Sequence, residues 1–107
     1  MRYIYVISGG EIYVKIGTSN HVGKRMRALT TGSPFELSIF DSIKLRSKAQ
    51  ANKHEREIHA KLAPLRARGE WFTIEPKHAM ATVLDVVMGD GAGQDYLAAL
   101  ARRDIPT

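Results

Sequence analysis

The feature that most constrains this chain is a pair of short alternating segments near its start, separated by two glycines. Residues 3–7 (YIYVI) and 12–16 (IYVKI) flank Gly9 and Gly10. Alternation with a period of two residues predicts β-strands, and glycine readily adopts the positive φ angles of a tight turn. The sequence therefore predicts a β-hairpin over residues 3–16.

The two faces of this hairpin carry different side chains, because successive residues of a strand point to opposite sides. The expected core face is aliphatic and consists of Ile4, Val6, Ile12, Val14 and Ile16. The other face carries three tyrosines and one cation, Tyr3, Tyr5, Tyr13 and Lys15. We expect this second face to be a polar, aromatic surface.

The remaining patterns predict a small domain of mixed secondary structure. In chain order they indicate a helix, a strand, a helix, an extended segment and a helix, at residues 20–29, 36–45, 47–62, 69–74 and 77–88. The second of these helices opens with a capping box formed by Ser47 and Gln50. We predict one domain over residues 1–88, with a linker and a terminal helix within residues 89–107.

Composition and charge narrow the classes of function. The chain has no cysteine, which excludes disulfides and cysteine-ligated zinc. The first apolar run is too short for a signal peptide or a membrane span, so we expect a cytoplasmic protein without a membrane partner. Residues 1–68 contain 13 Lys or Arg against 5 Asp or Glu, whereas residues 69–107 contain 3 against 6. This asymmetry fits a polyanionic partner or a well-solvated surface.

The helix predicted at residues 47–62 carries a carboxylate on its inner side. Glu55 and His59 are four residues apart and share a helix face with apolar side chains. A carboxylate that is buried alone is costly, so it requires a cationic partner or a metal ion. An internal salt bridge to Arg25 or Lys15 and a metal site both satisfy this requirement.

Arg25 lies at the edge of the apolar stripe of the first predicted helix, between Val22 and Leu29. A solvated surface arginine is one interpretation of this position. The other is phosphate recognition, for which a planar guanidinium can offer two parallel hydrogen bonds.

These motifs, in this order, resemble the GIY-YIG nuclease superfamily. The segment YIY (3–5) stands at the first motif of that family, with Tyr5 as the matching tyrosine, and KIG (15–17) stands at the second. Arg25 falls at the family's arginine position, and Glu55 falls at the position of its helix glutamate. The resemblance covers residues 3 to about 74.

The closest branch is the phage open-reading-frame group described as a DNA-binding domain. The run EREIH followed by GEWF resembles the signature of that branch and adds His59, Glu70 and Trp71. The chain departs from the wider family in two places. The first motif lacks its leading glycine, and Lys15 stands where the second motif has a tyrosine.

The resemblance implies a small α/β (α+β) fold, in which helices flank a central, mainly antiparallel, three-stranded sheet. It also implies a metal-dependent DNA endonuclease that hydrolyses phosphodiesters with Mg²⁺ or Mn²⁺. Double-stranded DNA is the expected partner, and a phage or mobile element is the expected context. A non-catalytic DNA-binding or regulatory module with the same fold is the alternative, because Lys15 alters the second motif.

The resemblance also assigns roles to individual residues. Glu55 is expected to hold the metal ion, and Arg25 is expected to bind the phosphate. Tyr5 is expected to activate or orient water, with Lys15 as the cation beside its phenol or as the base itself. Further candidates for catalysis are Tyr3, Tyr13 and His59. The expected nucleic-acid contacts are cationic residues of the two helices, Lys24, Arg27, Lys48, Lys53 and Arg56.

Overall fold

The two alternating segments form an antiparallel hairpin. The computed structural model describes residues 1–31 and 36–103; β1 spans Arg2–Gly9 and β2 spans Tyr13–Ser19. In the register of this pair, Val6 lies opposite Ile16. Gly10 has a φ of 91°, which a residue with a Cβ rarely adopts, so glycine permits the turn. The predicted hairpin is confirmed.

Three further strands complete an antiparallel sheet in the order β3-β1-β2-β5-β4. These strands are β3 (Leu37–Leu45), β4 (Arg66–Arg68) and β5 (Trp71–Thr73). The predicted antiparallel character is confirmed, but within residues 1–31 and 36–103 the sheet has five strands and not three. The prediction missed β4 because three residues reading RAR show no apolar alternation. Their pairing with β5 makes them a strand.

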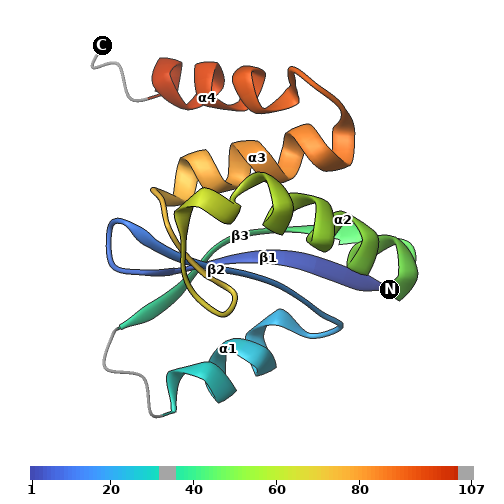
Figure 1. The fold of residues 1–107 in the computed structure, drawn as a ribbon, viewed down its shortest axis with the longest axis vertical. Helices are drawn as coiled ribbons and strands as arrows, with labels where there is room; N and C mark the ends of the chain where they lie inside the picture. Colours follow the sequence, from blue (N-terminus) through green and yellow to red (C-terminus); the bar gives the residue numbers. More distant parts are fainter. Residues whose placement is uncertain (32–35, 104–107) are drawn as a thin grey trace.

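Helices cover both faces of the sheet (Figure 1). On one side lies α1 (Val22–Thr30), and on the other lie α2 (Lys48–Lys61), α3 (Pro76–Met88) and α4 (Ala92–Arg103). A short 3₁₀ turn, Ala63–Leu65, links α2 to β4. None of the helices within the described ranges has the length and apolar character needed to cross a bilayer.

The larger core lies between the sheet and the helices α2 and α3. The face of the sheet that contributes to it, called here the α2 face, presents Ile4, Val6, Val14, Ile16 and Phe72. Ala51 and Ile58 of α2 and Met80 and Val83 of α3 pack against these residues. Ile12 is not part of this core: it lies in the hairpin turn and is 52% exposed, which corrects its expected position.

A smaller core lies beneath α1 on the opposite face of the sheet, called here the α1 face. Its sheet residues are Tyr5, Ile7, Leu37 and Trp71, and α1 covers them with Val22, Met26 and Leu29. The expectation of an open polar surface here is wrong for Tyr5, which is 1% exposed. Apolar residues spaced along α1 bury the ring, because that helix packs directly on the sheet.

The last two helices form a hairpin that is fixed by one carboxylate. Asp85 of α3 accepts hydrogen bonds from the backbone N–H groups of Gly91, at 3.2 Å, and Gly93, at 2.7 Å. A carboxylate at the start of a helix satisfies free N–H groups and complements the helix dipole. The segment GDGAG therefore leads into α4 through a capped turn.

Candidate active site

Tyr5 reaches the edge of β2 because Gly17 leaves room for its ring. The two residues are directly opposite in the register of β1 and β2. A Cβ atom placed on Gly17 would lie 2.7 Å from Cζ of Tyr5 and 3.3 Å from Oε2 of Glu70. The phenol therefore lies across the backbone of Gly17, and its oxygen is near the Glu70 carboxylate.

Gly17→Ala is expected to lower the melting temperature by about 5 °C or more, because the added methyl group overpacks a site filled by the Tyr5 ring. Gly23→Ala is the matched control, because a Cβ there would meet nothing closer than 3.6 Å. Thermal melting of both variants tests the expectation. Equal melting of Gly17→Ala and the parent would contradict it.

Arg25 is the cation that acts on the phenol. Its guanidinium lies close enough to the Tyr5 hydroxyl to lower the pKa of that group, although Arg25 is itself exposed on α1. Burial raises the pKa of Tyr5 above its ordinary value of 10.0, and the hydrogen bond and positive charge of Arg25 oppose that increase. Tyr5 is therefore a neutral phenol near pH 7, and Arg25 lowers the cost of ionising it.

Lys15 is held by a carboxylate and an aromatic ring. It is 8% exposed, and its Nζ lies 3.2 Å from Oε2 of Glu70 and 5.7 Å from the centroid of the Trp71 ring. Both partners make favourable electrostatic contacts with the buried lysine. Lys15 pairs with Glu70, whereas the cation that lowers the pKa of Tyr5 is Arg25; the role expected of Lys15, as the cation beside the phenol or as the base itself, stays a prediction.

Glu55 is a half-buried carboxylate on the side of α2 that faces β2. Burial raises the pKa of Glu55 above its ordinary value of 4.5, and the negative charge of Glu70 raises it further. Within the described residues, neither Arg25 nor Lys15 forms an ion pair with Glu55, so the internal salt bridges considered from the sequence are absent. The site therefore holds two carboxylates: Glu70 is paired with Lys15, whereas Glu55 has no direct ion pair within the described residues.

His59 fastens α2 to the edge of β2. Its Nε2 lies 2.8 Å from the carbonyl oxygen of Ile16, which can only accept, so Nε2 carries the proton. Its ring packs edge-on against Phe72 with centroids 5.0 Å apart. His59 therefore fixes the helix turn that presents Glu55.

The two remaining tyrosine candidates lie at different distances from this centre. Tyr3 is on the same face as Tyr5, two residues nearer the start of β1. Tyr13 pairs with Thr73 at the far end of β2, about 13 Å along the strand from Gly17. The fold therefore brings Tyr3 near the site and keeps Tyr13 away from it.

The cationic residues expected to contact DNA lie on two sides of the sheet. Lys24 and Arg27 are exposed on α1, whereas Lys48, Lys53 and Arg56 are exposed on α2. The two helices lie on opposite sides of the sheet (Figure 1). The α1 pair shares its side of the sheet with Tyr5 and Arg25. The three residues of α2 do not lie on that side.

Two residues of the site had no role assigned from the sequence. The motif KIG identifies Gly17 only as a motif position, although a glycine inside a strand often indicates the close approach of another group. The segment GEWF includes Glu70 but gives it no role. Its position follows from the Gly69-Glu70 turn between β4 and β5, in which Gly69 has a φ of 58°. The Glu70 carbonyl also accepts a hydrogen bond from the N–H of Ile16.

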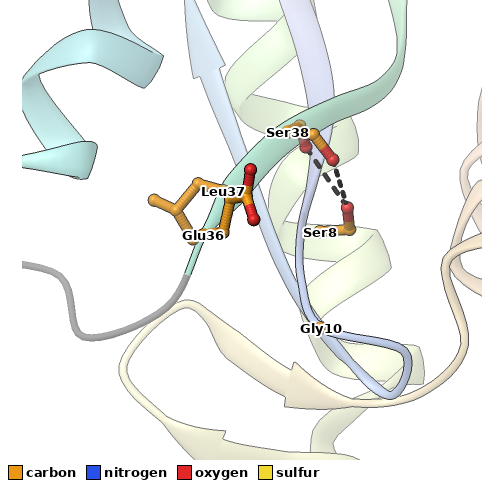
Figure 2. Close-up of a pocket in the computed structure, with 5 residues that line it drawn as sticks. All are labelled: Ser8, Gly10, Glu36, Leu37 and Ser38. Atoms are coloured by element: carbon orange, nitrogen blue, oxygen red, sulfur yellow. Dashed lines mark hydrogen bonds between the residues drawn. The ribbon is translucent and has the colours of Figure 1, made fainter.

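A hollow of about 410 Å³ lies at the other end of the hairpin (Figure 2). Five residues line it, Ser8, Gly10, Glu36, Leu37 and Ser38. The hydroxyl groups of Ser8 and Ser38 are 2.8 Å apart. None of the candidate catalytic residues lines this hollow, so it is separate from the Tyr5 site.

A search of curated proteins and a search of solved structures found no match to the chain. The family model of the T5orf172 domain matches residues 2–87, a span that contains the whole sheet, the helices α1 and α2, and all but the last residue of α3. It therefore includes Tyr5, Arg25, Glu55 and Glu70. The chain belongs to the T5orf172 domain family.

Proposed function

We propose that this protein is a metal-dependent DNA endonuclease of the GIY-YIG type. The observation that carries the proposal is the convergence on one edge of β2 of three groups from separate elements. These groups are the Tyr5 phenol, the Arg25 guanidinium and the Glu55 carboxylate, and the charges of the last two both act on the pKa of the phenol. Phosphodiester hydrolysis requires a base for water, a cation for the phosphate and stabilisation of developing charge.

Glu55 fits the hard divalent cation that such a reaction uses. Carboxylate oxygens suit Mg²⁺ and Mn²⁺, and Mg²⁺ is often held by one or two carboxylates together with water and substrate phosphates. Among the described residues, no three His, Cys, Asp or Glu side chains are grouped to hold a metal. The proposal is therefore for one protein ligand, Glu55, together with water and substrate oxygens. When bound, the ion would neutralise charge on the phosphate and the leaving oxygen.

The residues of the chain would then act on the water and the phosphate. Arg25, which is exposed and already directed at the phenol, would bind the phosphate oxygens. Tyr5 in its phenolate form would take the proton of the attacking water. The new bond forms between that water oxygen and phosphorus, the bond to the leaving oxygen breaks, and solvent supplies the proton for the leaving group.

A non-catalytic DNA-binding module is the second candidate. Lys15 favours it, because its charge is already paired with Glu70 and it replaces a tyrosine of the second motif. Conversion of supercoiled plasmid to open circles with Mg²⁺, Mn²⁺ or a chelator separates the two functions. Metal-dependent nicking supports the nuclease; DNA binding without nicking in either metal supports the module.

Arg25→Lys is expected to reduce nicking by about 10- to 100-fold while weakening DNA binding much less. Lysine keeps the charge but loses the planar fork that can hold the phenol and phosphate oxygens together. Single-turnover cleavage and DNA binding would be measured for parent, Arg25→Lys and the control Arg27→Lys on the same helix. Parental cleavage by Arg25→Lys would show that only a positive charge is needed.

A further inference from the structure

The β4–β5 hairpin carries two arginines that point to opposite faces of the sheet. Arg68 lies opposite Trp71, and Arg66 lies opposite Phe72. Residues two apart on a regular strand share a face, but the register of β4 against β5 shifts between Arg66 and Arg68, so each arginine takes the face of the residue opposite it. Arg68 therefore shares the α1 face with Trp71 and Tyr5. Arg66 shares the α2 face, where its guanidinium is 5.6 Å from the centroid of the Phe72 ring.

Arg68 continues a row of residues that starts inside the candidate site. The register places Lys15 opposite Trp71 and Trp71 opposite Arg68, across three neighbouring strands. Neighbouring strands are about 4.8 Å apart, so the backbone of Arg68 lies about 10 Å from that of Lys15. This distance corresponds to the axial rise of about three nucleotides of one DNA strand.

The charge balance of the site gives Arg68 a function. Lys15 and Arg25 are cations, Glu55 and Glu70 are anions, and the formal charges of these four side chains cancel. These four side chains alone, without the proposed metal ion, give no net attraction for the polyanionic backbone of DNA, so cations beside the site would add to its binding. Arg68 is exposed, and its side chain forms no ion pair or hydrogen bond within residues 1–31 and 36–103.

We propose that Arg68 is a phosphate-binding residue, which holds the DNA backbone on the β4 side of the site, about 10 Å from the backbone of Lys15. The inference rests on the proposed function and adds a second point of attachment to it. With the cations of α1 on one side of Tyr5 and Arg68 on the other, the backbone would be held across the α1 face. Arg68 touches no reacting atom, so it acts on affinity and position.

The test compares Arg68→Ala with two controls, Arg66→Ala on the same strand and Arg102→Ala, which is exposed near the end of α4. Binding of a short duplex would be measured by fluorescence anisotropy over a series of salt concentrations. Arg68→Ala is expected to weaken binding by about tenfold and to lower the slope of log K against log salt by about 1. In nicking, KM should rise while kcat stays within about twofold.

The outcomes separate this inference from the function on which it rests. If the parent binds no DNA at low salt, the proposed function itself fails. If the parent binds and Arg68→Ala matches both controls in affinity and salt slope, the inference is overturned. Arg68→Lys provides a second variant, which should keep the salt slope and regain part of the lost affinity. An equal loss in Arg66→Ala would also overturn the inference, because it would remove the difference between the two faces.

Discussion

Glu55→Gln is expected to abolish nicking, with a loss on the order of 10³-fold or more, and to leave the folded protein at least as stable as the parent at pH 7. The activity falls because glutamine lacks the charge that a hard divalent cation requires, and metal ions supply several kcal/mol of transition-state stabilisation. The folded variant should be at least as stable as the parent because burial raises the pKa of Glu55, which means that the charged carboxylate destabilises the folded state at neutral pH.

The sign of this stability effect depends on the pH. A carboxyl whose pKa is raised by folding binds its proton more tightly in the native state, so ionisation lowers stability as the pH rises above the ordinary value of 4.5. The melting temperatures of Glu55→Gln and parent should therefore converge below about pH 4.5 and differ in favour of the variant at neutral pH.

Thermal melting at several pH values and calorimetric titration with Mn²⁺ check the two halves of this expectation. Glu57→Gln is the control, because Glu57 is exposed on the same helix. It should keep parental nicking and metal binding. A marked loss of stability in Glu55→Gln, in a parent that binds no metal, would refute the metal site and favour the binding module.

Tyr5→Phe is expected to reduce kcat by about 10²- to 10³-fold with DNA affinity nearly unchanged. Phenylalanine fills the same space beneath α1, so the second core is retained while the proton acceptor is lost. Because burial raises the pKa of Tyr5 above 10.0, the parental rate should still increase with pH between 7 and 9, as more phenolate forms.

A pH–rate profile of the parent, Tyr5→Phe and the control Tyr96→Phe on α4 would decide this point. The control should behave as the parent at every pH, because Tyr96 packs against the α2-face core. A profile for Tyr5→Phe that retains the parental rise would assign the proton transfer to another group.

The sequence predicted the parts of the fold that depend on local pattern. The period of two in residues 3–16 and the glycine turn were sufficient for the hairpin, and Ser47 does cap α2 by accepting the N–H of Gln50 at 3.1 Å. Strand β4 could not be found in this way. Three residues without a pattern become a strand only because β5 provides a partner.

The features of the site that the sequence did not predict depend on contacts between distant segments. Alternation placed Tyr5 and Lys15 on one face, and this is correct. It could not show that α1 would bury Tyr5, because helix packing is decided by the whole chain. Nor could it show that Lys15 would pair with Glu70, which is 55 residues away and is brought close by the turn at Gly69.

The packing of the Tyr5 ring across Gly17 makes these two positions interdependent in evolution. A lineage that keeps the phenol has no room for a side chain at position 17, whereas one that replaces Tyr5 with a smaller residue is free to fill that space. The pair can therefore be read together in other members of the family. Tyrosine with glycine is the pair in which the phenol can reach the strand edge, whereas a larger residue at position 17 would occupy the space that the phenol takes here.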